Sequence, residues 1–347
     1  MKRSLSVLIV LLFFPVLASA QFDFSSGKPD SADSAGGPKR GERLTQVWRA
    51  GIIIEPGTAM ENVQITVPVP TDWYEQRVVS VSEEKMGADL ADKIQYRRIN
   101  NGALEMNVRI GNIKPVKTLE MVVAFEVENF ALLPPEKTDQ YVIPKRVPPE
   151  IRPYLRESPC IESDEPCFAK MFKEITKDRG TDWNKAEALY AFVQNNVKYD
   201  EDGFRHPAKG AFAVTKMPKG EWTGDCKDMS CLFVALCRAG KIPARIVRVP
   251  EHCYAEFYLE LKSTPDGKQS KAAKEKPAGF WFPCQVSGTY SFGGIPEQRV
   301  ILQKGDSFPD SEHPRNKTLF LKECFQGLLN AGAPRPVFKW IHETSVK

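Results

Sequence analysis

The sequence of 347 residues lacks most of the short motifs that assign a function directly. It contains no phosphate-binding loop, no nucleotide-binding fingerprint, no C-x-x-C knuckle and no internal repeat. A net charge of +4 without any aromatic and basic stripe gives no indication of a nucleic-acid partner. We therefore expect no cofactor, no bound metal and no nucleic-acid ligand, with zinc held by the cysteine-rich region as the disfavoured alternative.

Long apolar runs are also absent, except at the N-terminus. Lys2 and Arg3 precede the apolar stretch 7–16, and Ala18-Ser19-Ala20 follows as a small-residue cleavage site. The stretch is short for a membrane helix, which needs about 20 apolar residues. It predicts a signal peptide over 1–20 and an exported protein, periplasmic or secreted, with no membrane span after cleavage. A retained N-terminal anchor is the alternative.

The first half of the mature chain has the pattern of a linker followed by strands. Residues 21–43 are rich in Ser, Gly, Asp and Pro, so we expect a flexible linker. Over 44–133 apolar residues alternate with polar ones, and Asn100-Asn101-Gly102 suits a tight turn. This predicts an antiparallel β-sandwich domain, with alternation at Val63, Ile65, Val67, Val69, Leu104, Met106, Val108, Ile110, Leu119, Met121, Val123, Phe125 and Val127.

Residues 134–347 are predicted to form a second domain, because the apolar period becomes helical after this point. Helices and then strands follow one another, so the fold class is α+β, with helices packed on an antiparallel sheet. The lysine-rich stretch 262–279 is expected to be a solvated insertion. The predicted helices are 163–180, 181–197 and 225–240, and the predicted strands are 245–249, 252–261, 280–286 and an edge strand within 336–346.

Cys226 differs from the other cysteines in its position. Asp225 is a good N-cap, so Cys226 lies in the first turn of a helix, where free N–H groups and the helix dipole lower the pKa of a thiol. Any one cysteine is by default a buried structural residue, and Cys231 and Cys237 in the apolar body of this helix fit that role. The polar surroundings of Cys226 instead favour a reactive thiolate.

A thiolate nucleophile requires a base, and the chain has four histidines. His206 and His313 lie in polar loops and His342 is near the C-terminus, so all three are expected at the surface. His252 begins a predicted strand soon after the helix of Cys226. It is the best candidate for the base.

Several stretches together resemble the transglutaminase-like superfamily, whose members share a papain-like arrangement. They are Gly224-Asp225-Cys226, the RAGKIPAR stretch 238–245, and the HCYAE stretch 252–256. WFPCQ at 281–285 corresponds to the W-x-P-x-D stretch of the family. The resemblance covers roughly residues 160–290 and implies Cys226 as the nucleophile, His252 as the base and a third site residue at position 285.

Two positions depart from the family pattern. Tyr254 replaces a tryptophan, and Gln285 replaces the aspartate that orients the histidine. A glutamine carbonyl can accept the Nδ1–H of His252, although it adds no charge. The resemblance thus implies a Cys226–His252–Gln285 site with a weaker or retuned base. Trp222 and Tyr254 are expected to line the cleft or simply to pack.

The predicted strand pairing has a consequence for the cysteines. If His252 faces Gln285 across an antiparallel pair, Cys253 faces Cys284 on the opposite side of the sheet, away from the thiol. A contact or a disulfide is expected there, with two reduced core cysteines as the alternative. Cys160 and Cys167 could close a small loop at the head of their helix.

These features favour a thiol-dependent enzyme that acts on amide bonds of a protein or peptide through a thioester. Crosslinking follows if an amine is the acceptor, and deamidation or proteolysis follows if the acceptor is water. A non-catalytic transglutaminase-fold module that binds protein is the alternative. Gln285 is the feature that favours this second interpretation.

Overall fold

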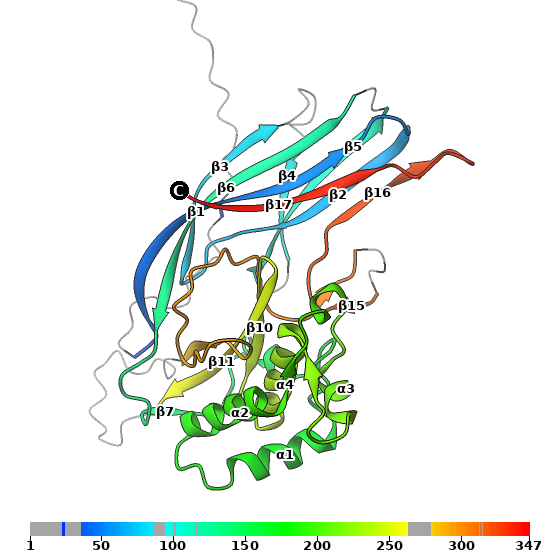
Figure 1. Cartoon of the computed structure of the whole chain (residues 1–347). Helices are drawn as coiled ribbons and strands as arrows, with labels where there is room; N and C mark the ends of the chain where they lie inside the picture. The colour runs from blue at the N-terminus through cyan, green and yellow to red at the C-terminus, as the bar shows by residue number, and fades with distance from the viewer. Residues whose placement is uncertain are drawn as a thin grey trace, which may run out of the picture.

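The computed structural model describes residues 23–24, 36–85, 94–99, 102–114, 117–262, 279–311, 313 and 315–347. The predicted signal peptide, most of the linker, the Asn100-Asn101 turn and most of the 262–279 insertion lie outside these residues. Two sheets form one half of the molecule in Figure 1, and a helical half lies against them. The predicted α+β class is confirmed. Within the described residues no helix is long and apolar enough to span a membrane.

The first half is a β-sandwich of two four-stranded antiparallel sheets. Alternate residues of the central strands point inward and form a single apolar core, as the period of two predicts. One sheet has the order β17 (Phe338–Val346), β1 (Lys39–Ile54), β6 (Leu119–Leu133) and β3 (Gln76–Lys85). The other has the order β16 (Cys324–Leu329), β2 (Met60–Val69), β5 (Leu104–Ile113) and β4 (Ile94–Arg98).

The predicted boundaries of this sandwich are wrong at both ends. β1 begins at Lys39, inside the expected linker, and Phe24 packs edge-on against Tyr96 and Phe125. At the other end, β16 and β17 leave the second half and each pair with a sandwich strand, so the red and blue ribbons lie together in Figure 1. β17 is an edge strand, as predicted. The C-terminal strands join the sandwich because Trp340 and Phe325 pack on its core.

The helical half is built around one buried helix and one sheet. In α4 (Cys226–Ala239) every residue except Lys227 and Ala239 is buried, and it packs on β10 and β11. The sheet has the order β12 (Gly279–Cys284), β11 (His252–Leu261), β10 (Ala244–Val249) and β13 (Gln303–Lys304), with β7 (Tyr141–Val142) also paired to β11. Around α4 lie α1 (Pro166–Thr176), α2 (Asp182–Asn196) and the unpredicted α3 (Ala211–Lys216).

Helix caps explain most of these boundaries. The side chain of Thr181 accepts a hydrogen bond from the backbone of Asn184, which starts α2 where the sequence predicted. α1 begins at Pro166 rather than at Ser163, because proline at the first helical position has the required φ and needs no N–H partner.

Two short pairs of strands complete the described structure. They are β8 (Lys198–Tyr199) with β9 (Thr223–Gly224), and β14 (Phe308–Pro309) with β15 (Lys317–Thr318).

Gly240 ends α4, as predicted, for a steric reason. Its φ is −86°, so no left-handed backbone is required there. A Cβ atom at this position would lie 2.0 Å from a ring carbon of Phe172, on α1. Glycine therefore permits the close packing of α1 against the end of α4.

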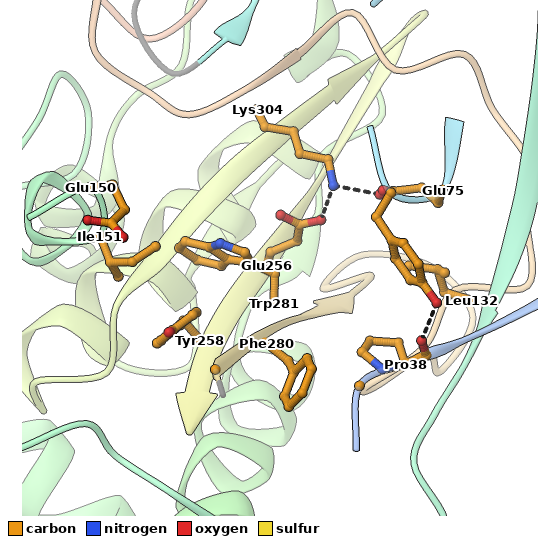
Figure 2. Close-up of a pocket in the computed structure, with 13 residues that line it drawn as sticks. Pro38, Glu75, Leu132, Glu150, Ile151, Glu256, Tyr258, Phe280, Trp281 and Lys304 are labelled. Carbon is orange, nitrogen blue, oxygen red and sulfur yellow. Dashed lines mark hydrogen bonds and ion pairs between the residues drawn. The ribbon is translucent and has the colours of Figure 1, made fainter. Parts of the chain in front are cut away.

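A buried ion-pair network joins the two halves. Lys304 donates hydrogen bonds of 2.6 Å to Glu75 of the sandwich and to Glu256 of β11, as Figure 2 shows. Glu256 also accepts a hydrogen bond of 2.6 Å from Arg245, its neighbour across β10 and β11. Arg245 and Glu256 belong to the two stretches that resemble the transglutaminase-like pattern. Their role here is to hold the sheet and the sandwich together.

Candidate active site

The N-terminus of α4 presents Cys226. The Asp225 carboxylate accepts hydrogen bonds from the backbone N–H groups of Lys227 and Asp228, at 2.9 and 3.1 Å, so Asp225 is the predicted N-cap. Cys226 is the first residue of the helix and lies in the field of its positive end. Gly224 precedes it because a Cβ there would lie 2.7 Å from the Cβ of Asp228.

A tight hairpin brings His252 to this helix end. β10 and β11 are joined by Pro250 and Glu251, and His252 is the first residue of β11, paired with Val249. Glu251 adopts φ = 56°, in the left-handed region that is unfavourable for a residue with a Cβ. The hairpin thus places His252 at the cleft that Cys226 also lines, and the His252 side chain helps to lower the pKa of the Cys226 thiol.

The surroundings of Cys226 stabilise its thiolate. The pKa of the Cys226 thiol is lowered from 9.0 to about 5, first by a hydrogen bond from the Cys253 thiol and then by the hydrogen bond and charge of His252. A hydrogen bond from the Cys253 backbone N–H adds to the effect, and burial opposes it. The buried thiols Cys231 and Cys237 show the contrast, because burial raises their pKa values well above 9.0. Cys226 is therefore the thiol suited to nucleophilic attack at neutral pH.

A cleft of about 470 Å³ opens over the nucleophile. Only 1% of Cys226 is exposed, yet this residue, His252 and Cys253 all line the cleft. The opposite wall is the segment 317–323, which includes β15. Sequence reasoning missed this wall because it belongs to a chain segment far from the motifs. His206, expected simply at the surface, also lines the cleft.

A smaller cavity of about 200 Å³ lies on the other side of the sheet, beside the Lys304 network. Figure 2 shows Trp281, Tyr258 and Phe280 along it. Its described lining residues include no cysteine and no histidine. The thiol chemistry predicted from the sequence therefore belongs to the larger cleft.

Within the described residues, no hydrogen bond joins Gln285 to His252 Nε2. Gln285 is buried, its Nε2 lies 3.5 Å from Glu297, and its Oε1 has no hydrogen-bond partner within the described part of the chain. The Nε2 atom of His252 likewise has no hydrogen-bond partner among the described residues. β12 ends at Cys284, and the backbone N–H of Gln285 donates to the carbonyl of Ser291.

The two expected cleft walls are packing residues. Trp222 packs edge-on against Phe192 and donates its indole N–H to the carbonyl of Met217. Tyr254 is buried in an apolar cluster on the sandwich side of the sheet, with Trp73. Neither lies among the described residues that line the cleft. His342 is exposed, as expected, and its ring stacks on the indole of Trp48.

The predicted pairing of Cys253 with Cys284 is wrong, and the alternative of two reduced core cysteines is what the structure shows. The observed register pairs Cys284 with Ala255, which shifts β12 by two residues from the expected position. Cys253 and Cys284 are free thiols that face the helix side of the sheet, within the core around α4. Cys253 therefore points toward Cys226 instead of away from it. Cys160 and Cys167 are also free, so the expected small loop is not closed by a disulfide.

Comparisons with known proteins agree with the fold. Residues 169–284 match the family model of the transglutaminase-like superfamily. An uncharacterized protein of Haemophilus influenzae is 26% identical over 203 residues, 56% of this chain. The match covers 51% of that curated relative, so the chain spans about half of its length.

A solved structure extends the likeness to nearly the whole chain. It is the crystal structure of a candidate cysteine protease from Cytophaga hutchinsonii, 16% identical, covering 89% of this chain and 92% of that chain with a TM-score of 0.56. At this identity the likeness concerns the fold alone. The helical half is thus similar to a transglutaminase-like domain over residues 169–284.

Proposed function

We propose that this protein is a thiol-dependent enzyme that acts on amide bonds of protein or peptide substrates. The observation that carries the proposal is the position of Cys226, which begins α4, contacts His252 and lines the 470 Å³ cleft. With a pKa of about 5, this thiol is ionised at neutral pH. A thiolate with an adjacent imidazole is the arrangement that nucleophilic catalysis requires.

The first chemical step forms a thioester. The Cys226 sulfur attacks the carbonyl carbon of the amide, and the C–N bond breaks as His252 gives a proton to the departing amine. The backbone N–H of Cys226, in the first turn of α4, is placed to stabilise the oxyanion of the tetrahedral intermediate. In the second step an amine or water attacks the thioester carbon, and the C–S bond breaks to release Cys226.

The substrate is a segment of protein or peptide, because the cleft is open and its wall combines apolar and charged side chains. Phe320 and Leu319 provide apolar surface, and Lys317 and Arg248 carry positive charge at the same cleft. A glutamine side chain and a peptide bond both present the required amide. The acceptor decides whether the outcome is crosslinking, deamidation or proteolysis.

The placement of Gln285 favours a second candidate function, a non-catalytic module that binds proteins. Its Oε1 and the Nε2 of His252 remain without hydrogen-bond partners among the described residues, so the imidazole lacks the orienting group that triads use. Thiol reactivity separates the two candidates. A binding module has no need for a Cys226 that reacts faster than the buried Cys231.

The proposal is tested by a screen for amine incorporation, deamidation and peptide hydrolysis. The wild-type chain is compared with Cys226→Ser and with Cys167→Ser, a matched control on α1 outside the cleft. The enzyme hypothesis predicts an activity that Cys226→Ser abolishes and Cys167→Ser retains. Activity that persists in Cys226→Ser, with the substitution verified by mass, excludes Cys226 as the nucleophile.

We further propose that the chain is exported after cleavage behind Ala20. The support is the sequence of residues 1–20, which has a basic start, an apolar stretch and a small-residue site. N-terminal sequencing of the mature protein should begin at Gln21. Recovery of an intact Met1 in the membrane fraction indicates a retained anchor instead.

A further inference from the structure

The thiol of Cys253 is an unexplained neighbour of the nucleophile. Cys253 follows His252 on β11, and its side chain faces α4 while those of Tyr254 and Glu256 face the sandwich. Its Sγ lies 4.0 Å from the hydroxyl of Ser230, which is one helical turn beyond Cys226 on the same side of α4. Cys253 and Cys226 line the same cleft and are each only 1% exposed.

Two separate groups of Cys253 contact the Cys226 sulfur. Its thiol and its backbone N–H both act as neighbours that lower the pKa of Cys226, and its Sγ also lies 4.0 Å from the Ser230 hydroxyl, to which it donates. A residue held in this way by its main chain and its side chain has little freedom to move its sulfur away. A disulfide requires Cβ atoms about 3.8 Å apart, so only a thiol that neighbours Cys226 at the same cleft can serve as its partner.

We propose that Cys226 and Cys253 form a reversible disulfide when a hydroperoxide enters the cleft, and that Cys253 thereby protects the nucleophile from irreversible oxidation. The proposal rests on the thiolate of the proposed function, although not on its amide chemistry. Cys253 acts as a resolving thiol, which means that its sulfur attacks the oxidised sulfur of Cys226 and closes the disulfide.

The chemistry proceeds in two balanced steps. The Cys226 thiolate attacks one oxygen of hydrogen peroxide, the O–O bond breaks, and Cys226 sulfenic acid forms with release of hydroxide. The sulfur of Cys253 then attacks the sulfenic sulfur, a disulfide forms, and water leaves with the Cys253 proton. Peroxide is reduced by two electrons and the two thiols are oxidised by two. A small-molecule dithiol reverses the process by thiol–disulfide exchange.

Two other cysteines could be considered as disulfide partners of Cys226. Cys231 lies deeper in α4. Cys160 donates its thiol to the carbonyl of Ala208. Cys160 is the competing resolving thiol, because it lines the same cleft. The two are distinguishable by digestion with trypsin, since Cys226 falls in peptide 220–227, Cys253 in 249–262 and Cys160 in 157–170.

The experiment treats the full-length protein with hydrogen peroxide at neutral pH, blocks free thiols with iodoacetamide and maps tryptic peptides without reduction. We expect peptides 220–227 and 249–262 to appear linked, with the mass of two hydrogen atoms lost. A dithiol should restore most of the alkylatable Cys226. In Cys253→Ser the link is absent and Cys226 advances to sulfinic or sulfonic acid, which a dithiol does not reverse.

Cys167→Ser is the control and should form the link as the wild-type chain does. The proposal is overturned if, in the wild-type chain, peptide 249–262 is recovered with Cys253 as a free alkylated thiol. In that case the Cys226 peptide 220–227 is overoxidised, unmodified or linked to the Cys160 peptide 157–170. The wild-type map alone decides this, so a misfolded variant cannot obscure it. The readout needs no amide substrate, so a linked protein without amide activity refutes the proposed function only.

Discussion

His252 and Gln285 each have one buried side-chain atom without a hydrogen-bond partner in the described part of the chain, His252 Nε2 and Gln285 Oε1. A cysteine site with a third orienting residue would join such atoms. In this structure Gln285 is turned toward Glu297 instead. Cys226 and His252 thus line the cleft together, without a hydrogen bond from Gln285 to His252 Nε2 in the described part of the chain.

Substitution of Gln285 should consequently have a small effect. We expect Gln285→Ala to change the alkylation rate of Cys226 by less than about threefold, whereas His252→Ala removes a direct contact with the thiol and should lower the rate by about 10-fold or more at pH 6. Rates are measured by mass spectrometry of peptide 220–227 over time. Equal losses in the two variants indicate a working Cys226–His252–Gln285 triad and contradict this account.

The buried network of Lys304 should contribute strongly to stability. Lys304→Met leaves the carboxylate of Glu75 buried without its cation, which costs about 3–5 kcal/mol of unfolding free energy. Lys39→Met is the matched control, because its ion pair with Glu136 is exposed and such pairs contribute about 0–1 kcal/mol. Urea denaturation of both variants measures the difference. Similar losses contradict a special role for the buried network.

Glu256 gives this network a pH dependence. Burial opposes ionisation, but the charges of Arg245 and Lys304 outweigh it and hold the pKa of the Glu256 carboxyl below its usual 4.5. A depressed folded-state pKa contributes stability that is present above pH 4.5 and lost as the pH falls through the folded-state value. We expect Glu256→Gln to be less stable than wild type at pH 7 and this deficit to shrink below pH 4.5. A deficit that grows on acidification contradicts the assigned charge.

The close contact at Gly240 predicts a steric effect. Gly240→Ala places a methyl group 2.0 Å from Phe172 and should cost about 1–3 kcal/mol through overpacking. Gly180→Ala is the control, since a Cβ there meets nothing within 4 Å. Pairing Gly240→Ala with Phe172→Ala should recover part of the loss in a double-mutant cycle. Strictly additive losses would show that the ring of Phe172 is not the cause.

The sequence allowed local structure and the nucleophile helix to be predicted, because these depend on neighbouring residues. Alternation located β2, β5 and β6, and Asp225 located the start of α4. The lowered pKa of the Cys226 thiol could be predicted because it depends on the position of this residue in the first turn of that helix. His252 was placed at a strand start by its own local pattern, and the structure brings it to the thiol.

Relationships between distant segments could not be predicted in the same way. Strand register depends on the turn geometry, and β12 pairs with β11 two residues away from the expected position, so that Cys284 pairs with Ala255. Which face of β11 packs on α4 also depends on tertiary packing, so the sequence did not indicate that Cys253 faces the helix. The return of β17 to β1 and the cleft wall at 317–323 depend on tertiary packing, for which the sequence has no local signal.

The pH dependence of Cys226 alkylation in the folded wild-type chain, followed on peptide 220–227, decides whether this thiol is a nucleophile. The rate should rise through a midpoint near pH 5, where the thiol ionises, and be nearly level at neutral pH. In His252→Ala the midpoint should move upward. A wild-type midpoint near 9, the ordinary value of a cysteine thiol, would contradict the claim that His252, Cys253 and the start of α4 make Cys226 a nucleophile.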